Sequence, residues 1–142
     1  MKVNVTLAFK GNCEEALNFY SKVFNKEIAV LSKFKDMPNV DSSVKESDLE
    51  KVIHSVLEIN EHVAIMANDD IMNHSTSGTS AGISLNFDNT ENLEEAENIY
   101  NMLTENGNVI MPFEKTFWGA YYGAIVDQFG VWWQINYQIE NL

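Results

Sequence analysis

The segment Glu14-Glu15-Ala16-Leu17-Asn18-Phe19-Tyr20 returns in the second half of the chain as Glu94-Glu95-Ala96-Glu97-Asn98-Ile99-Tyr100. Five of the seven positions carry the same residue in both copies. A repeat of this kind indicates that one structural unit occurs twice, provided that the flanking sequence repeats as well. The flanks therefore decide whether the chain folds as two related halves.

Both copies have the pattern of a helix with one apolar face. Apolar residues recur three and four positions apart, which places them along one side of an α-helix that packs against a sheet. In the first copy these residues are Ala16, Phe19, Tyr20, Val23 and Phe24. In the second copy they are Ala96, Ile99, Tyr100 and Leu103. We expect one such helix in each half.

Polar residues mark the expected ends of both helices. Asn12 is a candidate N-cap, and Glu15 follows it at the spacing of a capping box. Residues 88–90 supply the corresponding candidates in the second half. Asn25 and Gly107 are expected to end the two helices, because both residue types accept the left-handed conformation that is common at helix C-termini.

Four runs with strand character accompany the helix in each half, one before it and three after it. They span residues 3–9, 27–34, 52–59 and 63–67 in the first half, and residues 83–87, 109–117, 121–126 and 131–137 in the second. The last hairpin of each half turns at Asn60-Glu61 and at Asp127-Gln128-Phe129-Gly130. This order predicts an α+β fold made of two tandem βαβββ modules.

The expected elements divide the chain into two modules and a linker. The first module is expected at residues 1–69, with a polar insertion at residues 36–50. Residues 70–80 are rich in Ser, Thr and Asn and are interpreted as the linker. The second module is expected at residues 81–142, and together the two should form one domain, since 142 residues suit a single domain.

The chain is acidic, with a formal net charge of −12 at pH 7. Such a charge repels phosphate backbones and anionic lipids, so nucleic acid and membranes are not expected as partners. No run approaches the ~18 apolar residues of a membrane span. The single cysteine, Cys13, excludes an internal disulfide. Together with the lack of a secretory leader, this favours a cytoplasmic location.

Several short motifs, taken in order, resemble one known family. They are Gly11-Asn12-Cys13-Glu14-Glu15-Ala16, Phe19-Tyr20, Phe34-Lys35-Asp36-Met37-Pro38, Met111-Pro112, Phe117-Trp118-Gly119 and Asp127-Gln128-Phe129-Gly130-Val131. Over nearly its whole length the chain resembles the PhnB-like branch of the glyoxalase/bleomycin-resistance/extradiol dioxygenase (vicinal oxygen chelate) superfamily. The resemblance implies a cup-shaped mixed sheet with helices packed outside, and a homodimer. An older name used in this branch, demethylubiquinone methyltransferase, finds no support, because no Gly-rich strand-to-helix loop is present to hold a methyl-donor nucleotide.

The resemblance also locates the usual metal site of the superfamily. Metal-dependent members hold the ion with four His, Glu or Gln side chains on inward faces of strands. The matching positions fall on Val5, on Ile65 or Met66, on Gly82 and on Gln134. Only Gln134 has an atom that coordinates a metal, and one amide oxygen does not hold a divalent ion in water. We therefore expect neither a metal nor a cofactor.

The three histidines have different surroundings. His62 lies beside a hairpin turn and His74 in the linker, and both are expected at the surface. His54 lies inside an apolar strand, either as a half-buried, hydrogen-bonded residue or as a catalytic acid or base. Glu58 shares its face of the strand, but two residues four apart on a strand are separated by roughly 13 Å.

Strand alternation predicts the lining of the cleft. If Gly82 and Gln134 face inward, their alternate neighbours do too. These amides and hydroxyls would orient a ligand, while aromatic side chains would supply contact area. The aromatic residues after residue 116 also suit packing between sheet and helix or between the subunits of a dimer. The candidate ligand-binding residues are Ser84, Asn86, Trp118, Tyr122, Trp132, Gln134 and Asn136.

Three functions remain open from the sequence. The first is a metal-independent cleft that binds a small organic molecule. The alternative is an enzyme of the lyase, isomerase or dioxygenase type that uses His54 or an unanticipated metal site. A purely structural module is the third. Cys13 could have a lowered pKa in the first turn of a helix, but a lone cysteine with no basic partner is expected to be inert.

Overall fold

The computed structural model describes residues 1–40 and 43–139. It consists of two compact units, residues 1–76 and 77–142, and the boundary between them falls within the expected linker. The first unit contains β1 (Val5–Phe9), α1 (Cys13–Phe24), β2 (Ile28–Lys33), β3 (Val52–Glu58) and β4 (Ala64–Asp69). The second contains β5 (Ile83–Phe87), α2 (Leu93–Leu103), β6 (Asn108–Lys115), β7 (Ala120–Val126) and β8 (Trp132–Gln138).

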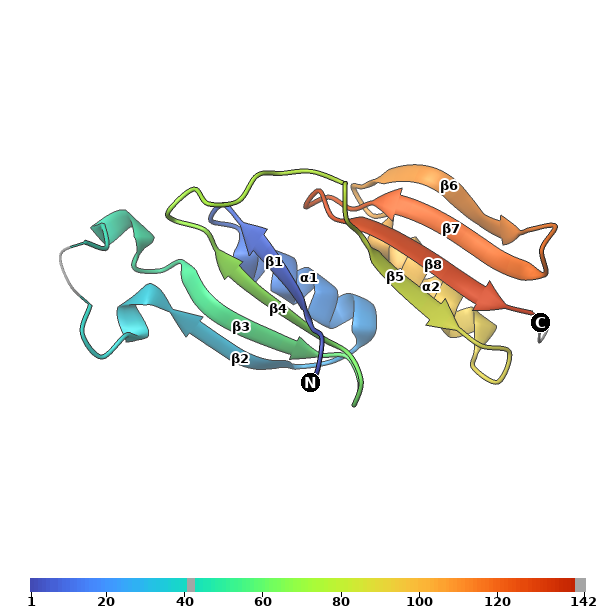
Figure 1. The fold of residues 1–142 in the computed structure, drawn as a ribbon, viewed down its shortest axis with the longest axis horizontal. Coiled ribbons are helices and arrows are strands. Elements are labelled where there is room, and N and C mark those ends of the chain that lie inside the picture. The colour runs from blue at the N-terminus through green and yellow to red at the C-terminus, as the bar shows by residue number, and fades with distance from the viewer. Residues whose placement is uncertain (41–42, 140–142) are drawn as a thin grey trace. The chain divides into compact units, whose positions relative to one another are not determined.

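Each unit is a four-stranded mixed sheet with one helix. The strand orders are β1-β4-β3-β2 and β5-β8-β7-β6. The pairs β1/β4 and β5/β8 are parallel, and the other neighbours are antiparallel. In Figure 1 each helix lies on one face of its own sheet. The prediction of two tandem βαβββ modules is confirmed. Among the described residues, no helix is both long and apolar enough to cross a bilayer.

The polar insertion extends the first unit between β2 and β3. A short 3-10 helix at Phe34–Asp36 leads into it and another, at Glu46–Asp48, lies within it, while its residues 41–42 lie outside the described residues. Glu50 forms ion pairs with Lys33 and Lys35 at 3.1 and 2.7 Å. These pairs connect the end of the insertion to the region where β2 ends, although exposed ion pairs stabilise a fold only slightly.

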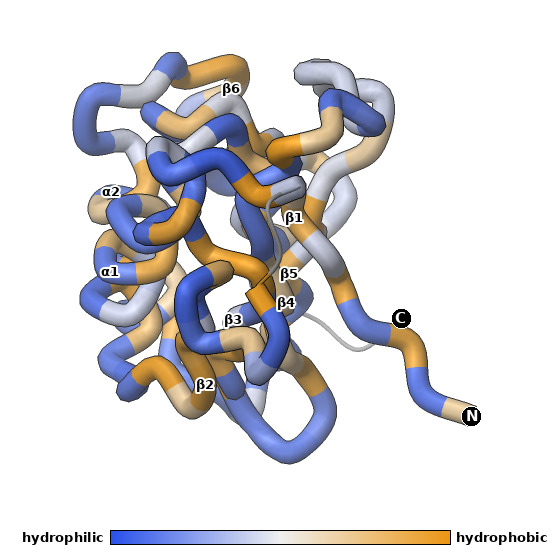
Figure 2. Tube along the Cα trace, turned by 90° about the vertical axis from the view of Figure 1, so that its left-hand side faces the viewer, coloured by the Kyte–Doolittle hydropathy of each residue, from blue (hydrophilic) through white to orange (hydrophobic). Residues whose placement is uncertain are grey.

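The apolar faces of the helices form the centre of each unit. On α1 the buried residues are Cys13, Ala16, Leu17, Tyr20, Val23 and Phe24, and on α2 they are Ala96, Ile99, Tyr100 and Leu103. The spacing predicted Phe19 on the apolar face of α1 and omitted Leu17, whereas Leu17 is fully buried and Phe19 is half-buried. Both helices alternate between hydrophilic and hydrophobic residues in Figure 2. The apolar stripe of each helix therefore covers its sheet, as its spacing predicts.

The N-terminus of α1 is capped from outside the helix. Asn12 makes no side-chain cap bond, so the predicted cap is wrong: its φ of −112° and ψ of 22° depart from the extended conformation of a capping residue. Instead, one carboxylate oxygen of Asp69 accepts from the backbone N–H of Gly11 at 2.8 Å and of Cys13 at 3.1 Å. The other oxygen accepts from the N–H of Val52 at 2.9 Å. Asp69 thereby joins the ends of three elements.

The N-terminus of α2 also differs from the prediction. Its cap is Asn92, whose side-chain oxygen accepts from the N–H of Glu94 at 2.9 Å. The predicted cap, residues 88–90, forms a separate turn in which Asp88 accepts from the N–H of Thr90 at 2.8 Å. An additional turn of polar residues between strand and helix therefore displaced the cap toward the C-terminus.

The two helix ends follow the predictions in part. Asn25 ends α1 in the left-handed conformation, with φ 51°, as expected. After α2 the left-handed residue is Asn106, with φ 54°, and not Gly107. Gly107 is required for a different reason, because a Cβ there would lie 2.8 Å from the carbonyl oxygen of Val126.

The sheet of the second unit packs on α2 through a close approach at Gly123. A Cβ at this position would lie 2.7 Å from Cε2 of Tyr100 and 3.0 Å from Cα of Phe113. The rings of Tyr100 and Phe113 are stacked at 5.5 Å, and Phe113 stacks in turn on Tyr121 at 5.8 Å. Phe113, Tyr121 and Gly123 therefore mark the face of the sheet that the helix covers.

The replacement Asp69→Ala should destabilise the protein by about 3 kcal/mol, since three N–H groups lose a charged acceptor. Asp69 is 2% exposed, so water replaces that acceptor poorly. Urea denaturation would measure the loss. Glu97→Ala, an exposed change of equal charge on α2, should alter the free energy of unfolding by less than about 0.5 kcal/mol. An equal loss in both variants would contradict this role for Asp69.

Gly123→Ala should cost about 2 kcal/mol, because the added methyl group overlaps Tyr100 and the backbone of β6. Gly78→Ala is the matched control, since a Cβ there meets no atom within 4 Å. Thermal unfolding of the two variants and the wild type would give the comparison. An unchanged melting temperature in Gly123→Ala would show that the close approach is not required.

Candidate functional site

The candidate binding residues lie on the face of the second sheet that α2 does not cover, here called the open face. Tyr121 and Gly123 face α2. Because successive side chains of a strand point to opposite faces, Tyr122 points away from the helix. Cross-strand partners point to the same side of a sheet, so the register of β7 extends this assignment to the other strands. Ser84, Asn86, Trp132, Gln134 and Asn136 therefore share the open face with Tyr122.

The polar residues of the open face form two rows across the strands. In the first row Ser84 pairs with Gln134, which pairs with Ala124. In the second row, here called the amide row, each residue is the direct partner of the next: Asn86, Asn136, Tyr122 and Glu114. Directly opposed side chains have Cβ atoms about 5 Å apart. The amide row therefore offers neighbouring donors and acceptors to a molecule lying on the sheet.

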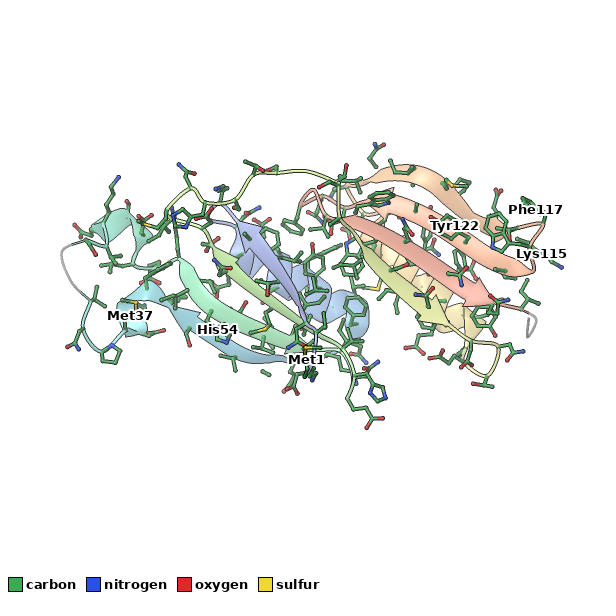
Figure 3. The ribbon with its side chains drawn as sticks, viewed as in Figure 1. Met1, Met37, His54, Lys115, Phe117 and Tyr122 are labelled. Atoms are coloured by element: carbon green, nitrogen blue, oxygen red, sulfur yellow. The ribbon has the colours of Figure 1, made fainter. Side chains whose placement is uncertain are left out.

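Aromatic side chains stand at the end of the amide row. Trp118, in the turn between β6 and β7, is 44% exposed, and its ring lies 6.2 Å from that of Tyr122 in an edge-to-face contact. Phe117 is 97% exposed and lies 5.0 Å from Trp118. Figure 3 shows Phe117 in this turn and Tyr122 on β7. These rings are not part of the core, so the alternative of ordinary packing within the unit does not explain their exposure.

Trp132 occupies the opposite end of the open face. Its position depends on Gly82, where a Cβ would lie 2.8 Å from the carbonyl oxygen of Trp132 and 3.3 Å from its side chain. The indole Nε1 of Trp132 is buried and has no hydrogen-bond partner among residues 1–40 and 43–139. A buried donor without a partner is costly. The unpartnered N–H marks Trp132 as a residue that the packing within the described residues does not fully account for.

Glu114 carries a negative charge on the open face, and this charge also acts on Tyr100 of α2. Burial raises the pKa of Tyr100, and repulsion from Glu114 adds to this effect, while a backbone hydrogen bond opposes it. The hydroxyl of Tyr100 donates to the carbonyl oxygen of Met111 at 3.0 Å. The negative charge of Glu114 on β6 therefore reaches a side chain of α2.

His54 lies in the first unit and differs from its expected setting. It is exposed rather than half-buried, and its imidazole forms no hydrogen bond with another described residue. Across β2 its partner is Ser32. Glu58 shares its face and is also exposed, but it lies four residues farther along β3. The two side chains are therefore not brought together. His62 and His74 are exposed, as predicted.

The register of the first sheet changes the expected metal positions. Val5 pairs with Ile65, and Leu7, two residues on, pairs with Ala67 and so with Ser55. The hydroxyl of Ser55 lies 3.8 Å from Sγ of Cys13 on α1. Val5 and Ile65 therefore face the helix, so the inward assignment of Val5 is wrong, and of the two alternatives Ile65 and Met66 it is Met66 that faces away from α1.

The residues at the metal positions do not fit a metal. Thr6 and Met66 are the paired residues that face away from α1. Neither is a His, Glu or Gln, and Gly82 adds no ligand atom in the second sheet. Within residues 1–40 and 43–139, no group of three or more His, Cys, Asp and Glu side chains is arranged to hold an ion. Gln134 remains the single residue of the family set with a coordinating oxygen.

The first unit also has a hollow of about 350 Å³ that the sequence did not indicate. It lies beside the β3–β4 turn, where Asn60 accepts from the N–H groups of His62 and Val63. The residues that line it come from separate segments of the chain, and of these segments only the hairpin turn was predicted from the sequence. The lining residues are Lys2, Lys26, Glu58, Ile59, Asn60, Glu61 and Ala64. His54 is absent from this set, so the hollow does not involve the catalytic candidate.

Cys13 is completely buried at the start of α1. Burial raises the pKa of its thiol to about 12, with further repulsion from Asp69 and Glu14. The contact with Ser55 only partly offsets this rise. The suggestion of a lowered pKa is therefore wrong, and the thiolate needed for nucleophilic chemistry is not formed near neutral pH.

The thiol of Cys13 should not react with 5,5′-dithiobis(2-nitrobenzoate) in the folded protein at about pH 8, because it is both buried and protonated. In concentrated urea the same thiol should react completely within minutes. Absorbance of the released thiolate measures both rates. Rapid reaction of the folded protein would contradict the burial of Cys13.

With the geometry described, the chain can be compared with known proteins. Residues 1–136 match the family model described as 3-demethylubiquinone-9 3-methyltransferase. Protein PA1353 from Pseudomonas aeruginosa has 30% sequence identity and a TM-score of 0.79, covering 97% of this chain and 98% of that one. A putative 3-demethylubiquinone-9 3-methyltransferase, PhnB protein, from Bacillus cereus has 27% identity and a TM-score of 0.76, covering 96% and 99%.

A more distant structure shares the fold. A glyoxalase/bleomycin resistance protein/dioxygenase family enzyme from Burkholderia phytofirmans PsJN has a TM-score of 0.60 at 17% identity, covering 94% of this chain and 95% of that one. At this identity the similarity concerns the fold alone. The match over residues 1–136 and the tandem βαβββ units place the chain in the PhnB-like (3-demethylubiquinone-9 3-methyltransferase-like) family, with the glyoxalase/bleomycin-resistance fold.

Proposed function

We propose that the protein binds a small organic molecule on the open face of the second sheet, and that it does so without a metal. The candidate binding residues are Ser84, Asn86, Trp118, Tyr122, Trp132, Gln134 and Asn136. The observation that carries the proposal is the amide row with exposed aromatic rings at its end. A few placed polar groups beside aromatic surface are the usual make-up of a small-molecule site.

The buried indole N–H of Trp132 supports the proposal independently. It lacks a hydrogen-bond partner among the described residues, and Gly82 is the residue that lets the ring take this position. A carbonyl or similar acceptor on the ligand would satisfy this N–H. Tyr122 pairs with Asn136 of the adjacent strand β8. Trp132 lies four residues from Asn136 along β8, so Trp132 and Tyr122 are separated by roughly 13 Å along the strand direction. That span suits a molecule of about two fused rings with substituents.

The absence of a fitting ligand set supports metal-independent binding. Of the family positions, Gln134 alone offers a coordinating atom, and a single neutral oxygen does not retain a divalent ion. The proposal therefore assigns Gln134 to hydrogen bonding with the ligand.

Two enzymatic functions have less support. For methyl transfer, the connections between strand and helix at residues 10–12 and 88–92 lack the Gly-rich sequence that holds a nucleotide. For acid–base chemistry, His54 has no carboxylate beside it, since Glu58 lies roughly 13 Å away along β3. No observation favours either function over binding.

The proposal includes a homodimer in the cytoplasm. The dimer follows from the family resemblance and the location from the single cysteine and the composition. Sedimentation equilibrium would test the dimer directly: a mass of twice 16.1 kDa supports it, and a monomer at all concentrations rules it out.

Binding should be detectable by ¹H–¹⁵N correlation spectra during titration with quinoline or benzamide. We expect shifts of the indole N–H of Trp118 and Trp132 and of the side-chain amides of Gln134 and Asn136. Tyr122→Ala should weaken binding about fivefold through lost ring contact, while the exposed helix variant Asn98→Ala should not. Shifts confined to the first unit, or none, would refute the open face as the site.

Transition metals should not stabilise the chelator-stripped protein beyond magnesium and calcium controls. A specific ion at a hundredfold excess over its Kd would add about 2.7 kcal/mol. For a chain of this size this would raise the Tm by several degrees, at about 2–4 °C per kcal/mol. A selective rise with nickel, zinc, manganese or iron would overturn the metal-independent proposal.

A further inference from the structure

Glu114 is the one charged residue that the strand register places on the open face of the second sheet. It pairs with Tyr122, and the other open-face residues of β5, β7 and β8 are amides, hydroxyls, aromatic or small apolar side chains. Lys115, the next residue, pairs with Tyr121 and so belongs to the face that α2 covers. No basic side chain of these four strands offsets the charge on the open face.

The carboxylate of Glu114 is free to act on a ligand. It is exposed, and it forms no ion pair or hydrogen bond with another described residue. Two other acidic residues, by contrast, are engaged within the protein: Asp69 with three N–H groups, and Glu50 with Lys33 and Lys35. Glu114 is therefore a fixed negative charge at the end of the amide row.

Aromatic rings stand directly beside this charge. Tyr122 is the cross-strand partner of Glu114, so their Cβ atoms lie about 5 Å apart. The ring of Trp118 contacts that of Tyr122 at 6.2 Å and is 44% exposed. The face of an aromatic ring attracts a cation, and tryptophan does so most strongly. A carboxylate and two rings thus favour the same sign of charge at one place.

We propose that Glu114, with Trp118 and Tyr122, selects organic cations, in particular a planar ring that carries a quaternary or protonated nitrogen. The inference rests on the proposed binding function of the open face and names the chemical class of its ligand. The nitrogen lies between the carboxylate and the rings, and the remainder of the molecule extends over the amide row. An anionic analogue is rejected, because it meets the carboxylate on a face where the four strands place no basic side chain.

Three probes of similar shape test this selectivity: 1-methylquinolinium, neutral quinoline at about pH 8, and 1-naphthoate. Indole and side-chain amide shifts in ¹H–¹⁵N spectra report both affinity and location. We expect the cation to bind roughly tenfold more tightly than quinoline, because the carboxylate and the aromatic faces both attract a positive charge. 1-Naphthoate should bind most weakly.

The variant Glu114→Gln should weaken 1-methylquinolinium about fivefold and leave quinoline unchanged, since only the charge is removed. Glu97→Gln, an exposed residue of α2, is the matched control for the overall net charge and should leave both affinities unchanged. Because Glu114 is exposed, the amide variant should fold normally, and its spectrum verifies this.

The outcomes separate the two proposals. If quinoline shifts the open-face residues but the cation binds no more tightly, or if both variants weaken it equally, selection by Glu114 is refuted while the binding function stands. If none of the three probes shifts the open face, the binding function and the selectivity are both refuted.

Discussion

The carboxylate of Asp69 is the constraint on which the first unit depends. It ends β4 and accepts from N–H groups at the start of α1 and at the start of β3. Its charge is compensated by these dipoles and by the N-terminus of the helix, with no basic side chain in contact. A buried carboxylate of this kind is tolerated only where several donors converge. It therefore fixes where the helix begins relative to the two central strands.

The second unit reaches the same fold through a different buried carboxylate. Asp127 lies in the β7–β8 turn and accepts from the N–H groups of Phe129 and Val131 and from the indole N–H of Trp133. It joins a turn to the largest core side chain instead of joining a helix to a sheet. The repeat therefore preserves the order of the elements and the helix stripe, while each half has its own way of fixing the strand ends.

The sequence predicted what depends on periodicity and missed what depends on a single partner. The helix stripes and the eight strands follow from spacings of 3.6 and 2, which each element carries within itself. The cap of α1 was missed because Asp69 lies far along the chain. The orientation of Val5 was missed because a shift of one residue reverses the face of a strand. The exposure of His54 was missed because its apolar neighbours suggested a buried strand, whereas His54 lies on the face of β3 opposite to Ser55, which contacts α1.

The same alternation explains how one half could acquire binding chemistry without losing its fold. Helix-facing residues such as Trp133 and Ile135 form the core, and the residues between them do not contact the helix. In the first unit the row that corresponds to the amide row consists of Thr6, Met66, Val56 and Val30, which offer few polar atoms. Substitutions on the open face change the surface at little cost to the core, because they alter every second residue only. The charge and amides of the second unit are therefore not required by the fold, as the proposed ligand site assumes.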